Sequence, residues 1–65
     1  MTAELLKAKD DATDLEQTTS WKRLMPYMTP IGVMRVNGEP RRYYRNRIGH
    51  YYYLRVAECE LYRNK

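Results

Sequence analysis

The dipeptide Asn37-Gly38 constrains the fold of this chain more than any other sequence feature. Asparagine and glycine tolerate the positive φ angles of a two-residue β-hairpin turn, and this pair is the strongest short-range hairpin signal. A β-favouring run at 31–36 precedes the pair, and a second run at about 41–46 follows it. Pro40, between the turn and the second run, is compatible with an edge strand or a bulge. The two runs are therefore predicted to pair as an antiparallel hairpin.

One further strand is expected after this hairpin. Gly49 can turn the chain, and residues 50–56 are dense in tyrosine and valine, which strands favour. The three strands would form an antiparallel meander. Beyond Val56 two endings stay open, a continued strand or a short C-terminal helix, and the spacing of Leu54 and Leu61 slightly favours the helix.

The N-terminal part of the chain has helical patterns. Residues 2–12 are rich in helix formers but have a weak apolar stripe, so a short or frayed acidic segment is expected at 1–12. Thr13 and Glu16 have the spacing of a capping box, which predicts a second helix that ends just before Pro26. The expected fold is α+β. An N-terminal helix or helix pair packs on a three-stranded antiparallel β-meander, with a short C-terminal helix as the slightly preferred ending.

The length of the chain limits the core that it can build. A chain of 65 residues buries only about 60% of its unfolded surface, so its stability margin is narrow. It has no phenylalanine, and Trp21 together with some tyrosines must therefore fill core volume. We expect one small domain, 1–65, with dependence on a protein partner as the alternative. Cys59 is the only cysteine, which excludes an internal disulfide but leaves a bridged homodimer open.

The sequence also bounds the compartment. No apolar run approaches the roughly 20 residues that a membrane helix needs. The N-terminus lacks the basic and apolar regions of a secretory signal, and its acidic residues argue against a transit peptide. The expected location is therefore intracellular, cytoplasmic or nucleoid-associated, without membrane contact.

Charge is distributed unevenly along the chain. Residues 1–20 hold two basic and five acidic side chains, whereas residues 21–65 hold ten basic and three acidic ones. All seven tyrosines lie in the second part. A basic, aromatic half next to an acidic segment favours a polyanionic partner for the basic half.

Arginines and tyrosines are interspersed in the second and third predicted strands. Guanidinium groups can donate two hydrogen bonds to a phosphate, and tyrosine rings can stack on bases. Such a surface predicts nucleic-acid binding, by these residues: Arg41, Arg42, Tyr43, Tyr44, Arg45, Arg47, Tyr51, Tyr53 and Arg55.

The alternation within the third strand predicts which of its side chains are buried. Tyr52 and Leu54 share one face with Val56 and form the better core set, which leaves Tyr51 and Tyr53 on the open face. The face of the second strand depends on whether Pro40 forms a bulge, so its assignment stays open.

Residues 20–45 resemble a known DNA-binding arrangement. Ser20-Trp21-Lys22-Arg23-Leu24, followed by Arg35-Val36-Asn37-Gly38 and Arg41-Arg42-Tyr43-Tyr44-Arg45, look like the recognition helix and wing of small excisionase-type winged-helix proteins. The likeness covers less than half of the chain, and we do not assign the family from it. It implies DNA as a partner and adds to that expectation.

These observations predict a small non-enzymatic nucleic-acid-binding accessory protein, with DNA slightly favoured over RNA. The alternative is a small subunit or inhibitor that docks on a larger protein or ribonucleoprotein assembly. Trp21, Met25, Met28 and the tyrosines would form its interface, and the arginines would meet an acidic surface. The chain has one histidine, one cysteine and one serine, and no Gly-rich phosphate loop or metal-ligand spacing. We therefore expect no enzyme activity, no cofactor, no metal and no small-molecule substrate.

Overall fold

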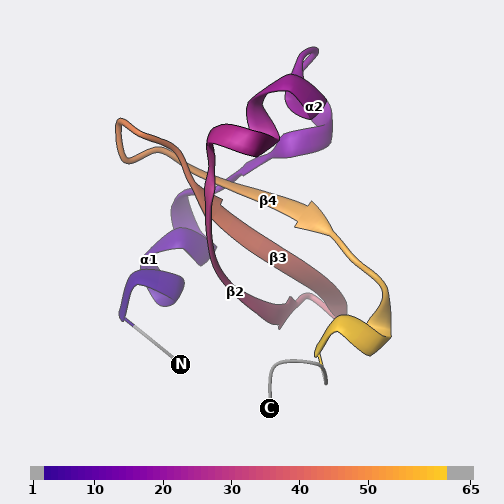
Figure 1. Cartoon of the computed structure of the whole chain (residues 1–65). Coiled ribbons are helices and arrows are strands. Elements are labelled where there is room, and N and C mark those ends of the chain that lie inside the picture. The colour runs from indigo at the N-terminus through magenta and orange to yellow at the C-terminus, as the bar shows by residue number, and fades with distance from the viewer. Residues whose placement is uncertain (1–2, 62–65) are drawn as a thin grey trace.

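The computed structural model describes residues 3–61. It contains short α-helices, 3₁₀ helices and one sheet (Figure 1). In chain order the elements are α1 (Ala3–Asp11), β1 (Thr13–Asp14), the 3₁₀ helix η1 (Leu15–Gln17), α2 (Trp21–Leu24), the 3₁₀ helix η2 (Met25–Tyr27), β2 (Thr29–Val36), β3 (Glu39–Arg45), β4 (Tyr51–Arg55) and the 3₁₀ helix η3 (Glu58–Leu61).

The sheet has four strands in the order β1-β4-β3-β2. Strands β2, β3 and β4 pair antiparallel as predicted, but β1 pairs parallel to β4, with Thr13 opposite Tyr52. The α+β class is confirmed, and the three-stranded meander is only part of a mixed sheet. The sequence did not predict β1 because two residues are too few to show a strand's alternation.

The predicted hairpin is confirmed. Val36 lies opposite Glu39, so Asn37 and Gly38 form a two-residue turn, and their φ angles are +54° and +77°. Two successive positive φ angles match the right-handed twist of the flanking strands. The irregularity of the pair lies at Ile31, between the Pro30 and Gly32 pairings, and not at Pro40.

Replacement of Gly38 by alanine should destabilise this turn through its backbone alone. A Cβ atom at Gly38 would meet no atom within 4 Å, so the substitution creates no clash. The left-handed conformation nevertheless costs an L-residue about 1–2 kcal/mol, and we expect that loss in the free energy of unfolding measured with urea. Asn37→Gly is the matched control and should be near neutral. A Gly38→Ala variant as stable as the parent would contradict the turn geometry.

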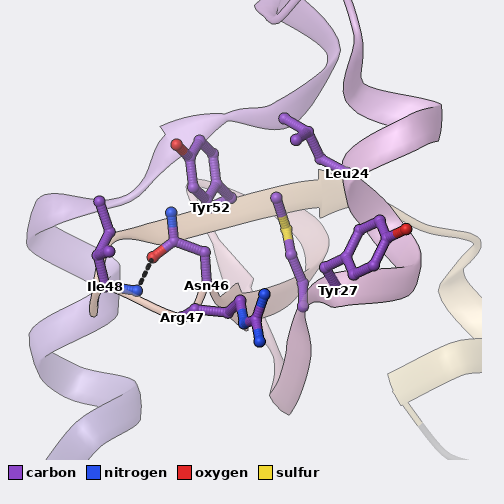
Figure 2. A pocket seen from close by; sticks show the side chains of 7 residues that line it. Leu24, Tyr27, Asn46, Arg47, Ile48 and Tyr52 are labelled. Carbon is purple, nitrogen blue, oxygen red and sulfur yellow. Dashed lines mark hydrogen bonds between the residues drawn. The ribbon is translucent and has the colours of Figure 1, made fainter.

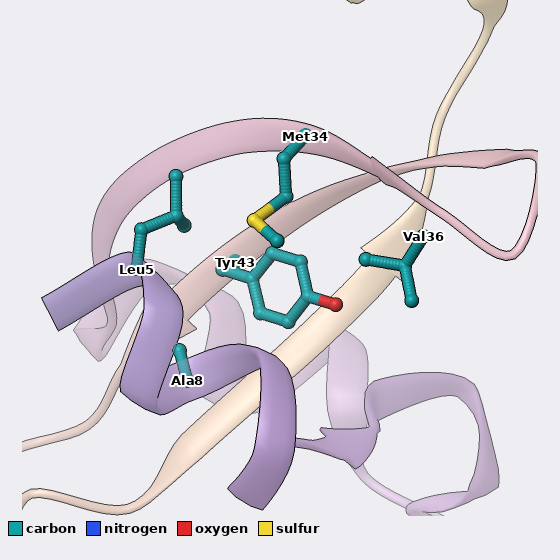
Figure 3. Close-up of a cluster of buried hydrophobic side chains, with 5 residues drawn as sticks. All are labelled: Leu5, Ala8, Met34, Val36 and Tyr43. Carbon is teal, nitrogen blue, oxygen red and sulfur yellow. The ribbon is translucent and has the colours of Figure 1, made fainter. Parts of the chain in front are cut away.

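Helix α1 packs on one face of the sheet. Its Leu5 and Ala8 are buried against Met34, Val36 and Tyr43 (Figure 3). Gly32 allows this approach, because a Cβ atom there would lie 3.2 Å from a methyl carbon of Leu5. The predicted N-terminal helix is therefore present, and it belongs to the core.

The second predicted helix is replaced by three short pieces, η1, α2 and η2. Asp14, rather than Thr13, caps η1, because its Oδ1 accepts a hydrogen bond of 3.0 Å from the Glu16 N–H. The polar residues at 18–20 then interrupt the helix, and Pro26 lies within η2. Helix α2 has four residues, which is shorter than the recognition helix that the winged-helix resemblance implies.

The segment formed by η1, α2 and η2 lies on the side of the sheet opposite α1. Tyr44 pairs with Tyr52, and both point away from the face of Tyr43 because side chains alternate along a strand. Leu15 is fully buried and Tyr44 is buried. Each face of the sheet is therefore covered by its own small apolar group.

The chain after β4 forms a 3₁₀ helix rather than the α-helix that the spacing favoured. Arg35 of β2 forms an ion pair with Glu58, and Arg42 of β3 forms one with Glu60, so η3 is held against two strands. Residues 62–65 lie outside the described part. Within 3–61 no helix is long and apolar enough to cross a membrane.

Candidate binding surface

Most of the predicted nucleic-acid surface lies on one face of the sheet. Tyr43 pairs with Tyr53 and Arg45 pairs with Tyr51. Helix α1 packs on the same face: Tyr43 is fully buried, and Tyr51 and Tyr53 pack against the α1 cluster. The expectation that Tyr51 and Tyr53 remain on an open face is therefore wrong. The physical reason is that α1 needs an apolar surface to cover, and the tyrosine rings provide it.

Tyr52 and Leu54, which the alternation of β4 predicted as the core set, are not more buried than Tyr51 and Tyr53. Tyr52 and Leu54 are half-buried, as Tyr51 and Tyr53 are, and Tyr44 is almost completely buried on the side of Tyr52. Both adjacent tyrosines of β3 are thus buried, one on each side of the sheet. Neither Tyr43 nor Tyr44 offers a ring for base stacking.

The arginines of the sheet are paired with carboxylates of the same chain. Arg41 Nε lies 2.7 Å from Glu39 Oε1, and Arg55 Nε lies 3.3 Å from Glu39 Oε2. Arg55 also lies 3.6 Å from Asp14. The remaining pairs join Arg35 with Glu58, Arg42 with Glu60 and Arg45 with Glu4. Five arginines thus have five carboxylate partners, two of them in the sheet and three on α1 and η3, so the charges of these ten side chains cancel.

The contacts of Arg41 are all made with residues of the same chain. Its guanidinium carbon lies 4.2 Å from the centre of the Tyr53 ring, a cation–π contact. Burial lowers the pKa of Arg41, but the Glu39 carboxylate and the phenols of Tyr43 and Tyr53 outweigh burial, so the net pKa is raised. The charged Arg41 side chain is therefore stacked on Tyr53 and paired with Glu39.

Outside the arginine–carboxylate pairs, the net positive charge of the described residues comes from α2 and from the loop between β3 and β4, not from the sheet. Helix α1 carries two lysines and two aspartates besides the paired Glu4. The cations that remain are Lys22 and Arg23 of α2 and Arg47 of the loop between β3 and β4, against Glu16. Of the nine predicted site residues, Arg47 is the one that the structure places with these cations.

A pocket of about 320 Å³ lies between the α2–η2 segment and the loop that joins β3 and β4. We call it the α2 pocket, and Figure 2 shows side chains from α2, η2, β4 and the β3–β4 loop around it. Its lining residues are Leu24, Tyr27, Met28, Asn46, Arg47, Ile48 and Tyr52.

Three of the apolar side chains that line the α2 pocket are exposed to solvent. Ile48 is 82% exposed and Tyr27 is 68% exposed. Leu24 is also exposed. A chain short of aliphatic residues thus leaves several of its large apolar side chains together at one open hollow, which is typical of a surface that meets a partner.

The loop that carries Ile48 is held in place by its own hydrogen bonds. The Oδ1 atom of Asn46 accepts hydrogen bonds from the Ile48 N–H at 3.2 Å and the His50 N–H at 2.8 Å (Figure 2 shows the first). The Asn46 N–H also donates to the His50 carbonyl at 3.0 Å. Gly49, with φ of +89°, provides the left-handed residue that closes the loop. Arg47 and Ile48 are therefore presented at a fixed tip.

No acidic residue lies in the segments that build the α2 pocket. The stretch 17–38 contains no Asp or Glu, and neither does 40–57. On α2, which contributes Leu24 to the pocket, Lys22 lies with its Nζ 5.7 Å from the centre of the Trp21 ring. Arg47 is the one charged residue among the described residues that line the hollow.

Among the lining residues, the sequence indicates Arg47 as a phosphate contact, and Met28 and the tyrosines as interface residues of a docking protein. It does not indicate Leu24 and Ile48 as site residues, because the pocket joins two segments that are distant along the chain. The signal that could have found them is the absence of acids from both segments. Within 3–61 no group of three or more His, Cys, Asp or Glu side chains is placed to hold a metal ion.

Comparison of the chain with protein-family models, curated proteins and solved structures found no significant match. The functional argument therefore depends on the geometry of the α2 pocket.

Proposed function

We propose that this protein is a small non-enzymatic binding module that docks on a protein partner through the α2 pocket. The observation that carries the proposal is the exposed apolar group of Leu24, Tyr27 and Ile48 around one hollow. Burial of such side chains is the main favourable term in protein association, and interface centres are enriched in Tyr, Met and Arg. Tyr27, Met28 and Arg47 bring these three residue types together in one pocket.

The lining of the α2 pocket favours a protein over a nucleic acid. Leu24, Met28 and Ile48 are aliphatic and suit an apolar side chain better than the polar edge of a base. The Oδ1 atom of Asn46 is already engaged by the loop. Base recognition would need additional polar groups in the hollow.

Nucleic-acid binding is the second candidate, favoured by the net positive charge around the α2 pocket and by the exposed ring of Tyr27. Contact of three cations with phosphates would give a slope of log affinity against log salt of about −2 to −3. Labelled duplex DNA, single-stranded DNA and RNA titrated at two salt concentrations would measure it. Arg47→Ala should then reduce the slope by about one.

Selection from a displayed peptide library tests the docking proposal. We expect peptides that bind the parent protein and lose at least about tenfold in affinity with Ile48→Asp, because interface centres exclude charge. Leu6→Asp is the matched control: Leu6 is also exposed, at 51%, but lies on α1. Peptides that bind both variants equally, or no binding peptides at all, would contradict the proposal. Oligonucleotide binding that depends on Arg47 would favour the second candidate.

A further inference from the structure

We propose that the partner segment of the α2 pocket is acidic: a short peptide stretch with one bulky apolar side chain flanked by Asp or Glu. This inference rests on the proposed docking function and specifies the chemistry of the partner. The apolar side chain would enter the hollow between Leu24, Tyr27 and Ile48. The flanking carboxylates would meet Arg47 and the cations of α2.

The first step of the argument is the charge around the pocket. Five arginines of the sheet are paired with carboxylates of the same chain, so they are committed internally. Lys22, Arg23 and Arg47 have no carboxylate partner within 4 Å among the described side chains. Arg47 lines the pocket, and Lys22 and Arg23 lie on α2 beside the lining residue Leu24. Charged interfaces are arranged with complementary potentials, so these cations favour a negatively charged partner.

The second step is the size and lining of the hollow. A volume of about 320 Å³ lies at the lower end of the range of ligand pockets, and it has room for a bulky apolar side chain rather than a folded element. Tyr27 and Tyr52 contribute rings, while Leu24 and Met28 contribute flexible aliphatic surface. Such a pocket accepts Leu, Phe or Trp side chains by shape and polarity.

The third step excludes a second copy of the chain as the occupant. A symmetric pair formed through this surface would place Arg47 and the α2 cations of both protomers in one interface. Like charges in contact oppose association. The Arg47 side chain lines the hollow itself, so the repulsion would act at the centre of such an interface.

Three labelled synthetic peptides of equal length test the inference by fluorescence anisotropy. All carry a central Trp, and the flanking residues are Asp and Glu, or Asn and Gln, or Lys. We expect the acidic peptide to bind about tenfold more tightly than the amide peptide, because three partly exposed charge pairs add up to that factor. The lysine peptide should bind most weakly. Raising the salt concentration should reduce the difference between the acidic and the amide peptide.

Arg47→Glu provides the charge test, with Lys9→Glu of α1 as the matched control for net charge. Arg47→Glu should weaken the acidic peptide more than the amide peptide, and Lys9→Glu should affect neither by more than about twofold. Equal binding of acidic and amide peptides, both dependent on Ile48, would overturn the acidic preference while the docking function stands. Loss of the Ile48 dependence for every peptide would overturn the docking function itself.

Discussion

Replacement of Tyr43 by alanine is expected to lower the free energy of unfolding by about 3–5 kcal/mol, as for other buried aromatic residues. Tyr43 is fully buried between α1 and the sheet, and its ring centroid lies 5.8 Å from that of Tyr53. Small domains have total stabilities near the lower end of about 5–15 kcal/mol. The variant should therefore be largely unfolded at room temperature, which circular dichroism and urea titration would measure.

Tyr43→Phe is the control that separates the ring from its hydroxyl. The buried Tyr43 Oη atom has no hydrogen-bond partner among the described residues, although the Arg41 guanidinium lies close enough for the phenol to affect its pKa. An unpartnered buried hydroxyl is costly, so its removal should leave stability unchanged or raise it by about 1 kcal/mol. A loss as large as that of Tyr43→Ala would show that the hydroxyl, not the ring, stabilises the core.

Leu15→Ala is expected to cost about 2–5 kcal/mol, the range for buried leucines that leave a cavity. Leu15 is fully buried and begins the segment that leads to α2. Its loss removes the apolar contact of η1 on the side of the sheet away from α1. Urea denaturation followed by Trp21 fluorescence measures the effect.

The matched control for this prediction is Leu6→Ala. Leu6 is 51% exposed on α1, so its truncation should change stability by no more than about 0.5 kcal/mol. If both substitutions lowered the free energy of unfolding equally, the difference in burial between Leu6 and Leu15 would be contradicted.

The parts of the fold that the sequence predicts are those with local causes. Asn37 and Gly38 specify the hairpin because their own backbone preferences favour the turn. Helix α1 follows from the propensities of consecutive residues. The two-residue strand β1 and the division of the second helix into three pieces depend on contacts with β4 and on Asp14 as a cap, which no local pattern indicates.

The candidate site was harder to predict because its electrostatics depend on distant pairings. Arg45 and Glu4 are 41 positions apart, and Arg42 and Glu60 are 18 apart. In the sequence these arginines appear available for phosphates; in the fold they are neutralised. Arg47, two positions after Arg45, has no carboxylate partner among the described residues, because it lies in the loop between β3 and β4.

The loop between β3 and β4 has a consequence for how this protein can evolve. Asn46 and Gly49 set the loop conformation, whereas Ile48 at the tip is 82% exposed and Arg47 is exposed, so neither contributes much to the interior. If the proposed docking function holds, changes at these two tip positions would alter the recognised partner at little expense in folding. New specificities could then arise here one substitution at a time.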